Sequence, residues 1–338
     1  MVSRMGIEVW EQDRWHSDQR EHVRAVDALT AAHRARRSRG ERHPVWDFMF
    51  TYYPVKPSAL RKWSPGPGIA LVLDGAATGR NSDSMDAGND GNDGDPLPAG
   101  LNGPSYFRVQ YDAPSGTTVA ILDTEAFATA RGRAVRHIHR LLTATAARPA
   151  QMNCFGMHEW AMVYRDTPRH PERLRLGRDA TDAVVESSRL RCTHFDAYRF
   201  FTSPAAPRNS LAPTRESQVD LEQPGCLHAT MDLYKWATKL GPLIPGDLWL
   251  DTFRLACDVR ATDMEASPYD LADWGFEPVQ VETPAGRAEY VRRQRDFADR
   301  GRDLRGRIIS VIEDCYPHLQ RHPSALVKET ADVTTRSH

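Results

Sequence analysis

The chain has 338 residues, 40% of them hydrophobic, and its 44 basic and 45 acidic residues leave a formal net charge of −1. Such a chain can bury one large core or two modest ones, but no apolar run approaches the roughly 20 residues of a membrane-spanning helix, and the N-terminus lacks the apolar core of a secretion signal. Five widely spaced cysteines without a CxxC pair argue against a disulfide framework or a zinc ribbon. We therefore expect a cytoplasmic protein with no membrane partner.

The first predicted helix, over 17–39, ends near Gly40 in a basic run. Five arginines lie in this run: Arg34, Arg36, Arg37, Arg39 and Arg42. Basic side chains at the end of a helix interact favourably with its free carbonyl groups, which is the structural interpretation. The alternative is a patch that contacts the phosphates of a nucleic-acid backbone.

An acidic tract interrupts the next predicted elements. Residues 79–100 contain one arginine and five aspartates, a local charge of −4, so the rest of the chain carries +3. This tract is rich in Gly, Asn and Asp and cannot bury apolar surface, so we predict a disordered acidic insertion over 76–104. Apolar stretches on both sides of it predict a hairpin-like pair of strands.

The other elements follow from periodicity, caps and turn residues. In chain order they are a short buried helix at 44–53, strands at 69–73, 106–111 and 118–122, helices at 123–147 and 151–164, a strand favoured at 189–201, helices at 224–240 and 247–263, a strand at 279–282 and a long charged helix at 285–315. The pattern predicts an α+β, predominantly helical fold. We expect a single compact domain over 1–325 and a flexible tail over 326–338.

The helix over 224–240 is apolar around most of its circumference. Its narrow polar wedge holds His228, Asp232, Lys235 and Lys239, so the imidazole and the first carboxylate lie one turn apart on one face. This wedge is either the solvent strip of a mostly buried helix or the lining of a polar cleft.

The following helix has Asp247, Asp251, Arg254 and Asp258 on one face and apolar residues on the other. Arg260 and Asp263 project into that apolar side, which a plain amphipathic pattern does not explain. They form either an internal ion pair or a catalytic carboxylate held by an arginine.

Three other clusters could contribute to the same site. His43 and Asp47 are four residues apart, and His43 could instead cap the helix; His158 and Glu159 lie in very apolar surroundings, where a lone core histidine is the more common outcome. His194 and Asp196 would point to one side of the strand expected there. Asn209 and Gln218 in the loop that follows are amides of the kind that read base edges, although loop amides usually bond the backbone.

Several long segments resemble one bacterial family. They read HPVWDFMFTYYP, MNCFGMHEWAMVYR, RCTHFDAYRFFTSPAAPRN, QPGCLHATMDLYKWATKL and DVRATDMEASPYDL. They are similar to segments of proteins, common in actinobacteria, that are labelled 3-methyladenine DNA glycosylases, and the resemblance spans most of the chain outside the acidic insertion and the two tails. It implies hydrolysis of the N-glycosidic bond of a modified or alkylated base, with DNA or a nucleoside-like substrate as partner and no cofactor. It assigns no catalytic residue.

For that chemistry the chain offers a carboxylate and a proton carrier next to aromatic surfaces. The catalytic candidates are Asp263 or Asp232 with His228 or His194, the substrate-binding candidates are Trp236, Tyr269, Phe200, Phe201 and Arg260, and Arg34, Arg36, Arg37 and Arg39 would contact the backbone. An alkylated purine is cationic, which suits carboxylates and aromatic faces.

Two alternatives stay open. The first is a metal-dependent enzyme that acts on a small molecule or nucleoside, in which His and Asp side chains hold non-haem iron or manganese in a helical core. The ligand candidates are His43, Asp47, His228, Asp232 and Asp258, with His194 and Asp196 nearby in the pattern. The second is a non-catalytic nucleic-acid-binding module, in which the basic run matters and Asp263 does not.

Overall fold

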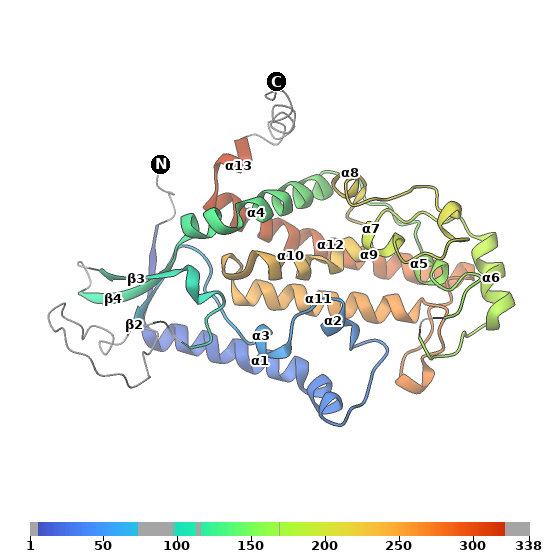
Figure 1. The fold of residues 1–338 in the computed structure, drawn as a ribbon, viewed down its shortest axis with the longest axis horizontal. Coiled ribbons are helices and arrows are strands. Elements are labelled where there is room, and N and C mark those ends of the chain that lie inside the picture. Colours follow the sequence, from blue (N-terminus) through green and yellow to red (C-terminus); the bar gives the residue numbers. More distant parts are fainter. Residues whose placement is uncertain (1–5, 74–96, 98, 113–115, 169, 322–338) are drawn as a thin grey trace, which may run out of the picture.

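The computed structural model describes residues 6–73, 97, 99–112, 116–168 and 170–321. Four long helices run roughly parallel along the longest dimension of the molecule, and a small sheet lies at one end of them (Figure 1). These helices are α1 (Gln12–Ser38), α4 (Thr124–Ala146), α11 (Gly246–Glu265) and α12 (Pro284–Cys315). The prediction of an α+β, predominantly helical fold is confirmed.

The sheet has four strands in the order β1-β2-β4-β3. The strands β2 (Ile69–Leu73), β3 (Phe107–Asp112) and β4 (Thr117–Leu122) lie where the apolar stretches predicted them and pair antiparallel, β2 with β4 and β4 with β3. The strand β1 (Glu8–Trp10) adds in parallel to β2 and was not predicted, because three residues are too few to show a periodicity.

The predicted acidic insertion falls mostly on residues 74–96 and 98, which lie outside the described residues, as does the predicted tail. The C-terminal end of the predicted insertion, by contrast, is part of the fold. Leu101 is buried, and a backbone bridge joins it to Trp63, with the Trp63 N–H donating to the Gly100 carbonyl at 2.9 Å. The predicted boundary at residue 104 was therefore several residues too far.

The helix α11 lies at the centre of the helical layer. It packs against α12, α9 (Leu227–Met231) and α10 (Leu233–Leu240), and also touches α1. The helix predicted over 224–240 is thus two helices that meet at Asp232. The shorter elements are α2 (Phe48–Thr51), α3 (Pro57–Leu60), η2 (Pro104–Tyr106), α5 (Met157–Ala161), α6 (Gly177–Ser187), α7 (Phe195–Tyr198), η3 (Ala206–Arg208), α8 (Gln218–Leu221), η4 (Gly241–Leu243), η5 (Ala272–Trp274) and α13 (His318–Arg321).

Two predicted strands are wrong. The stretch 189–201 contains an irregular segment followed by α7, because the side-chain amide of Asn209 takes the place of a neighbouring strand: its Oδ1 accepts from the Cys192 N–H at 2.7 Å and its Nδ2 donates to the Cys192 carbonyl at 2.9 Å. Residues 279–282 form an irregular segment and turn in which Val279 and Val281 are buried, and the Val279 N–H donates to the Glu265 carbonyl at the end of α11. Of the helix predicted over 151–164, only α5 forms.

All five cysteines are free thiols. Among the described helices, none combines the length and apolarity needed to cross a membrane.

The loop before α9 is fastened on two sides. The Gln223 side-chain oxygen accepts from the N–H groups of Gln151 and Gly225, and the Gly225 carbonyl accepts from Gln294 of α12 at 2.5 Å. A Cβ at Gly225 would lie 2.5 Å from the Gln151 carbonyl oxygen. Only glycine allows this approach of the two backbones.

We expect Gly225→Ala to lower the free energy of unfolding by about 1 to 3 kcal/mol, because the two backbone segments must separate. The matched control is Gly306→Ala, in the interior of α12, where a Cβ would meet nothing within 4 Å. Removing a helical glycine there is expected to stabilise the protein by about 0.5 to 1 kcal/mol. Urea denaturation followed by circular dichroism measures both, and equal effects of the two substitutions would contradict the packing argument.

Candidate metal centre

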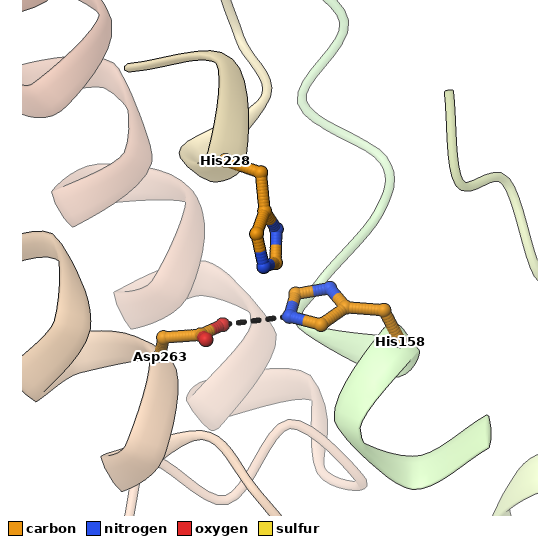
Figure 2. Close-up of side chains that lie close together, drawn as sticks. All are labelled: His158, His228 and Asp263. Carbon is orange, nitrogen blue, oxygen red and sulfur yellow. Dashed lines mark hydrogen bonds and ion pairs between the residues drawn. The ribbon is translucent and has the colours of Figure 1, made fainter. Parts of the chain in front are cut away.

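Three buried side chains from separate segments meet in the helical layer: His158 from α5, His228 from α9 and Asp263 from the last turn of α11 (Figure 2). One ligand-capable atom of each lies within 4.8 Å of the other two. Among the described residues, it is the one group of three or more His, Cys, Asp or Glu side chains whose ligand atoms lie this close together. We call it the His158 triad.

The local structure of each segment accounts for these positions. Gly156 has a φ of 69° and starts α5, and a Cβ there would press against Tyr290 and Ala266 at 3.2 and 3.3 Å. The turn therefore brings α5 close to the end of α11. His228 lies in the first turn of α9, directly after the loop that Gln223 and Gly225 fasten. This position places its imidazole next to His158 and Asp263.

The His158 and Asp263 side chains form a buried ion pair. The Nε2 of His158 lies 2.7 Å from Oδ1 of Asp263, and both side chains are almost fully excluded from solvent. Burial alone would lower the pKa of His158, but the Asp263 carboxylate outweighs it and raises that pKa well above its usual value. Burial likewise opposes ionisation of Asp263, whose pKa is nevertheless held well below its usual range by His158. The pair is charged although it is buried.

The imidazole of His228 has a different environment. Its ring centroid lies 4.4 Å from that of His158, nearly perpendicular, and 5.3 Å from that of His194, nearly stacked. Burial, and then the positive charge of His158, lower the pKa of His228 well below its usual value. His228 is therefore a neutral imidazole at physiological pH, which is the form that binds metals.

Two further groups position the triad. Nη1 of Arg260 lies 3.3 Å from Oδ2 of Asp263 and 3.4 Å from the Glu159 carboxylate, and its guanidinium stacks over the Phe48 ring at 4.0 Å. The second oxygen of Asp263 is thereby held away from His158. On the other side, Sγ of Cys154 lies 3.8 Å from Nδ1 of His158. Arg260 was predicted to bind substrate, but it is buried and its charge is used inside the protein.

A second buried group adjoins the triad, and we call it the Asp232 network. His194 Nε2 lies 3.2 Å from the Glu222 carboxylate and 3.5 Å from Asp232 Oδ2, at ion-pair distance without hydrogen-bond alignment. Burial opposes protonation of His194, but Glu222 and Asp232 raise its pKa to about 9. Asp232 also accepts from the Tyr53 hydroxyl and from Lys235, each at 2.9 Å.

The polar wedge of the predicted helix therefore divides. His228 and Asp232 are buried, whereas Lys239 is exposed and Lys235 is half-buried with its ammonium bridging Asp232 and Asp196. Of the two residues expected to line a polar cleft, His228 lines a small cavity and Asp232 is enclosed in the buried network, while Lys239 fits the solvent-strip interpretation. The structure brings the predicted residues Asp263, Asp232, His228 and His194 into one region.

Three of the residues predicted as metal ligands lie elsewhere. Nδ1 of His43 accepts from two backbone N–H groups at the start of the turn before α2, and the Asp47 carboxylate accepts from the His43 N–H at 3.0 Å. His43 therefore caps the turn that precedes α2, whereas the structural interpretation expected it to cap the helix itself. Asp258 is exposed and pairs with Arg300 of α12 at 2.6 Å. The ligand set predicted from spacing alone therefore does not come together.

The aromatic residues predicted to stack on a base do not line the cavity beside His158. Trp236 is buried under Lys235 and Lys239, Tyr269 packs in a small apolar cluster with Met264, Phe201 lies in the main core, and Phe200 is covered by Arg199. The cavity itself has a volume of about 10 Å³. It can hold one water molecule or ion, which is far less than a nucleobase needs.

Two of the five arginines of the basic run form local ion pairs. Arg39 makes two bonds of 2.7 Å with Glu41, and Arg34 pairs with Asp27 at 3.2 Å. Arg36 is half-buried and Arg37 exposed, both in the last turn of α1. These pairs involve carboxylates and not the carbonyl groups at the end of the helix, so both interpretations of the run stay predictions.

Sequence reasoning left His158 between a contribution to the site and a core histidine, and it did not place Glu222 or Tyr53. The signal for His158 was present, since a His-Glu pair in an apolar helix needs buried partners. No local signal pointed to Glu222, because its partner His194 is 28 residues earlier and its burial depends on α8 and the fastened loop.

The comparisons with known proteins add no relative: no family model, no curated protein and no solved structure matches this chain.

We expect Asp232→Asn to lower the free energy of unfolding by about 3 to 5 kcal/mol, because it leaves His194 and Lys235 with less opposing charge in a buried site. Asp258→Asn is the matched control, since its pair with Arg300 is solvent-exposed, and it should change stability by less than about 1 kcal/mol. Chemical denaturation of both variants measures the difference. Similar losses for the two would contradict the importance of the buried network.

Proposed function

We propose that the protein is a metal-dependent enzyme whose centre is the His158 triad, and that it takes a divalent first-row transition ion, iron or manganese. The observation that supports this is the approach of two imidazoles and one carboxylate to within 4.8 Å of one another. Two histidines and one carboxylate are the ligand set typical of non-haem iron enzymes.

The donor atoms fit such an ion. Metal bonds of about 2.0 to 2.2 Å to nitrogen and oxygen require neighbouring ligand atoms roughly 3 Å apart. The His158 and Asp263 donors are 2.7 Å apart, and the His228 imidazole approaches them from the side (Figure 2). Binding of an ion would release the proton that His158 Nε2 shares with Asp263, and small rotations of the side chains would then bring the three atoms around the ion. A cavity of about 10 Å³ lined by His158 and His228 is large enough for an ion.

The chain's own residues have defined tasks in this proposal. Arg260 holds one oxygen of Asp263 and leaves the other for the ion, while Cys154 contacts the far nitrogen of His158 and orients its ring. Three protein ligands leave coordination positions for a substrate or water, and the ion would supply Lewis-acid or redox chemistry there. The surrounding core limits access of bulk water.

The Asp232 network supports the same centre from outside. His194 stacks on His228 and stays protonated through Glu222 and Asp232, so it disfavours a proton on His228 and keeps that ligand neutral. The half-buried Lys235 and Asp196 lead from this network toward the surface. This chain of titratable groups is suited to moving protons to and from the centre.

Cleavage of a modified base from DNA, which the family resemblance implies, stays a prediction. Asp263 is committed to His158 and Arg260, and the adjacent cavity is too small for a base. The geometry favours the metal-dependent alternative, because a cavity of about 10 Å³ holds an ion. The small molecule or nucleoside of that alternative would require this cavity to open. The proposed centre combines one residue of the predicted ligand set, His228, with Asp263 and His158.

We expect protein purified without added metal to contain close to one equivalent of a transition metal, measured by inductively coupled plasma mass spectrometry. His228→Ala should lose it, because one of three protein ligands is removed. His43→Ala is the matched control, since this other buried histidine bonds the backbone and should leave the metal content unchanged.

Equal metal content in His228→Ala and the unaltered protein, at full occupancy, would contradict the proposal. Loss of metal in both variants would instead favour the ligand set predicted from spacing. The same preparations also test the glycosylase prediction: release of alkylated bases from DNA by chelator-treated, metal-free protein would favour that activity over the metal-dependent one.

A further inference from the structure

A basic cleft lies between the C-terminal end of α4 and the middle of α12, two helices that pack side by side (Figure 1). Its volume is about 360 Å³, in the range of pockets for small ligands. Its lining includes four arginines, Arg148, Arg295, Arg302 and Arg305, and one acidic residue, Asp299. The formal charges of these five residues therefore add up to +3.

Arg305 at the floor of this cleft is the exceptional residue. It is 1% exposed, and none of its three guanidinium nitrogens has a hydrogen-bond partner among the described residues. Burial lowers its pKa to about 10, so it keeps its charge at neutral pH. Arg260 shows the usual situation by contrast, since that buried guanidinium has two carboxylates and an aromatic ring around it.

The neighbouring acidic groups are already engaged. Asp299 pairs with Arg302, and the Glu222 carboxylate contacts His194 and accepts from Gln218 at 2.6 Å. Arg148 donates to the Glu222 main-chain carbonyl at 2.9 Å. A buried guanidinium without a partner costs several kcal/mol, so its retention points to a partner that comes from outside the chain.

We infer that this cleft binds a small phosphorylated molecule, with its phosphoryl oxygens on Arg305 and with Arg295 and Arg302 at the rim. The planar fork of donors on a guanidinium matches a phosphoryl group, and several arginines around a dianion satisfy more of its oxygens than one. A single phosphate would fill only part of the cleft, and Ala146, Met152 and Ala298 offer apolar surface for the rest of the ligand.

This site is separate from the proposed metal centre, and the inference does not depend on the metal. The two share one boundary: Pro224 lines the cleft, whereas Gln223 and Cys226 of the same loop line the small cavity beside His228. A ligand in the cleft would therefore touch the loop that leads into α9.

Binding of inorganic phosphate to the full chain, measured by isothermal titration calorimetry at constant ionic strength, tests the site. We expect saturable binding with one equivalent and at least tenfold weaker affinity in Arg305→Met, equivalent to about 1.4 kcal/mol. The matched control Arg292→Met changes an exposed arginine of the same helix that pairs with Glu289 outside the cleft, and should bind phosphate as the unaltered chain does.

Thermal unfolding in phosphate-free buffer separates binding from folding. Arg305→Met removes an unpartnered buried charge, so it should unfold at the same temperature as the unaltered chain or higher, and phosphate should no longer stabilise it. Should Arg305→Met fail to fold, Arg302→Gln at the exposed rim should weaken phosphate binding severalfold while leaving unfolding in phosphate-free buffer unchanged.

Ribose 5-phosphate, acetate and a short DNA duplex distinguish the kinds of ligand. Tighter binding of ribose 5-phosphate than of inorganic phosphate would support a small phosphorylated molecule. No saturable phosphate binding, equal affinity in Arg305→Met, or acetate binding as tight as phosphate would overturn the inference. Binding of the duplex more tightly than ribose 5-phosphate, with loss in Arg305→Met, would also overturn it in favour of a nucleic acid.

Discussion

The buried ion pair of His158 with Asp263 is the interaction on which the centre of this structure depends. Two opposite charges at 2.7 Å in a dry core are stable only if their remaining polar atoms also have partners. Arg260 occupies the second carboxylate oxygen, Cys154 contacts the far imidazole nitrogen, and the neutral His228 closes the group. These contacts link α5, α9 and α11, so the same contacts that hold the core together also bring together three side chains that could hold a metal ion.

The Asp232 network continues the buried polar contacts toward the surface, through the half-buried Lys235 and Asp196. Asp232 interrupts one apolar helix into α9 and α10 and receives bonds from Tyr53 and Lys235, while His194 contacts its other side. A carboxylate with this many partners resists protonation, and its charge keeps His194 protonated next to a neutral His228. Neighbouring imidazoles whose pKa values are shifted in opposite directions mark this region as a candidate functional site.

Arg305 is a buried charge whose guanidinium nitrogens have no hydrogen-bond partner among the described residues. Arg260 and Arg305 are both almost fully excluded from solvent, yet only the first has carboxylates within ion-pair distance. The difference separates a structural arginine from one suited to an external anion. The proposed metal centre and the arginine cleft lie on two sides of the loop that Gly225 fastens to Gln151 and Gln294, so this loop is the element that relates them.

By itself the sequence determined the helical character of the fold, three of the strands of the described sheet and the burial of Arg260 and Asp263, because periodicity is a local property. It also singled out His228, Asp232 and His194 as unusual in apolar surroundings. Only the tertiary structure decided that His158 belongs with them, that His43 and Asp47 form a cap, and that Asp258 faces solvent. Spacing along one helix reports which residues share a face, whereas a site between segments as far apart as residues 158 and 263 depends on how those segments pack.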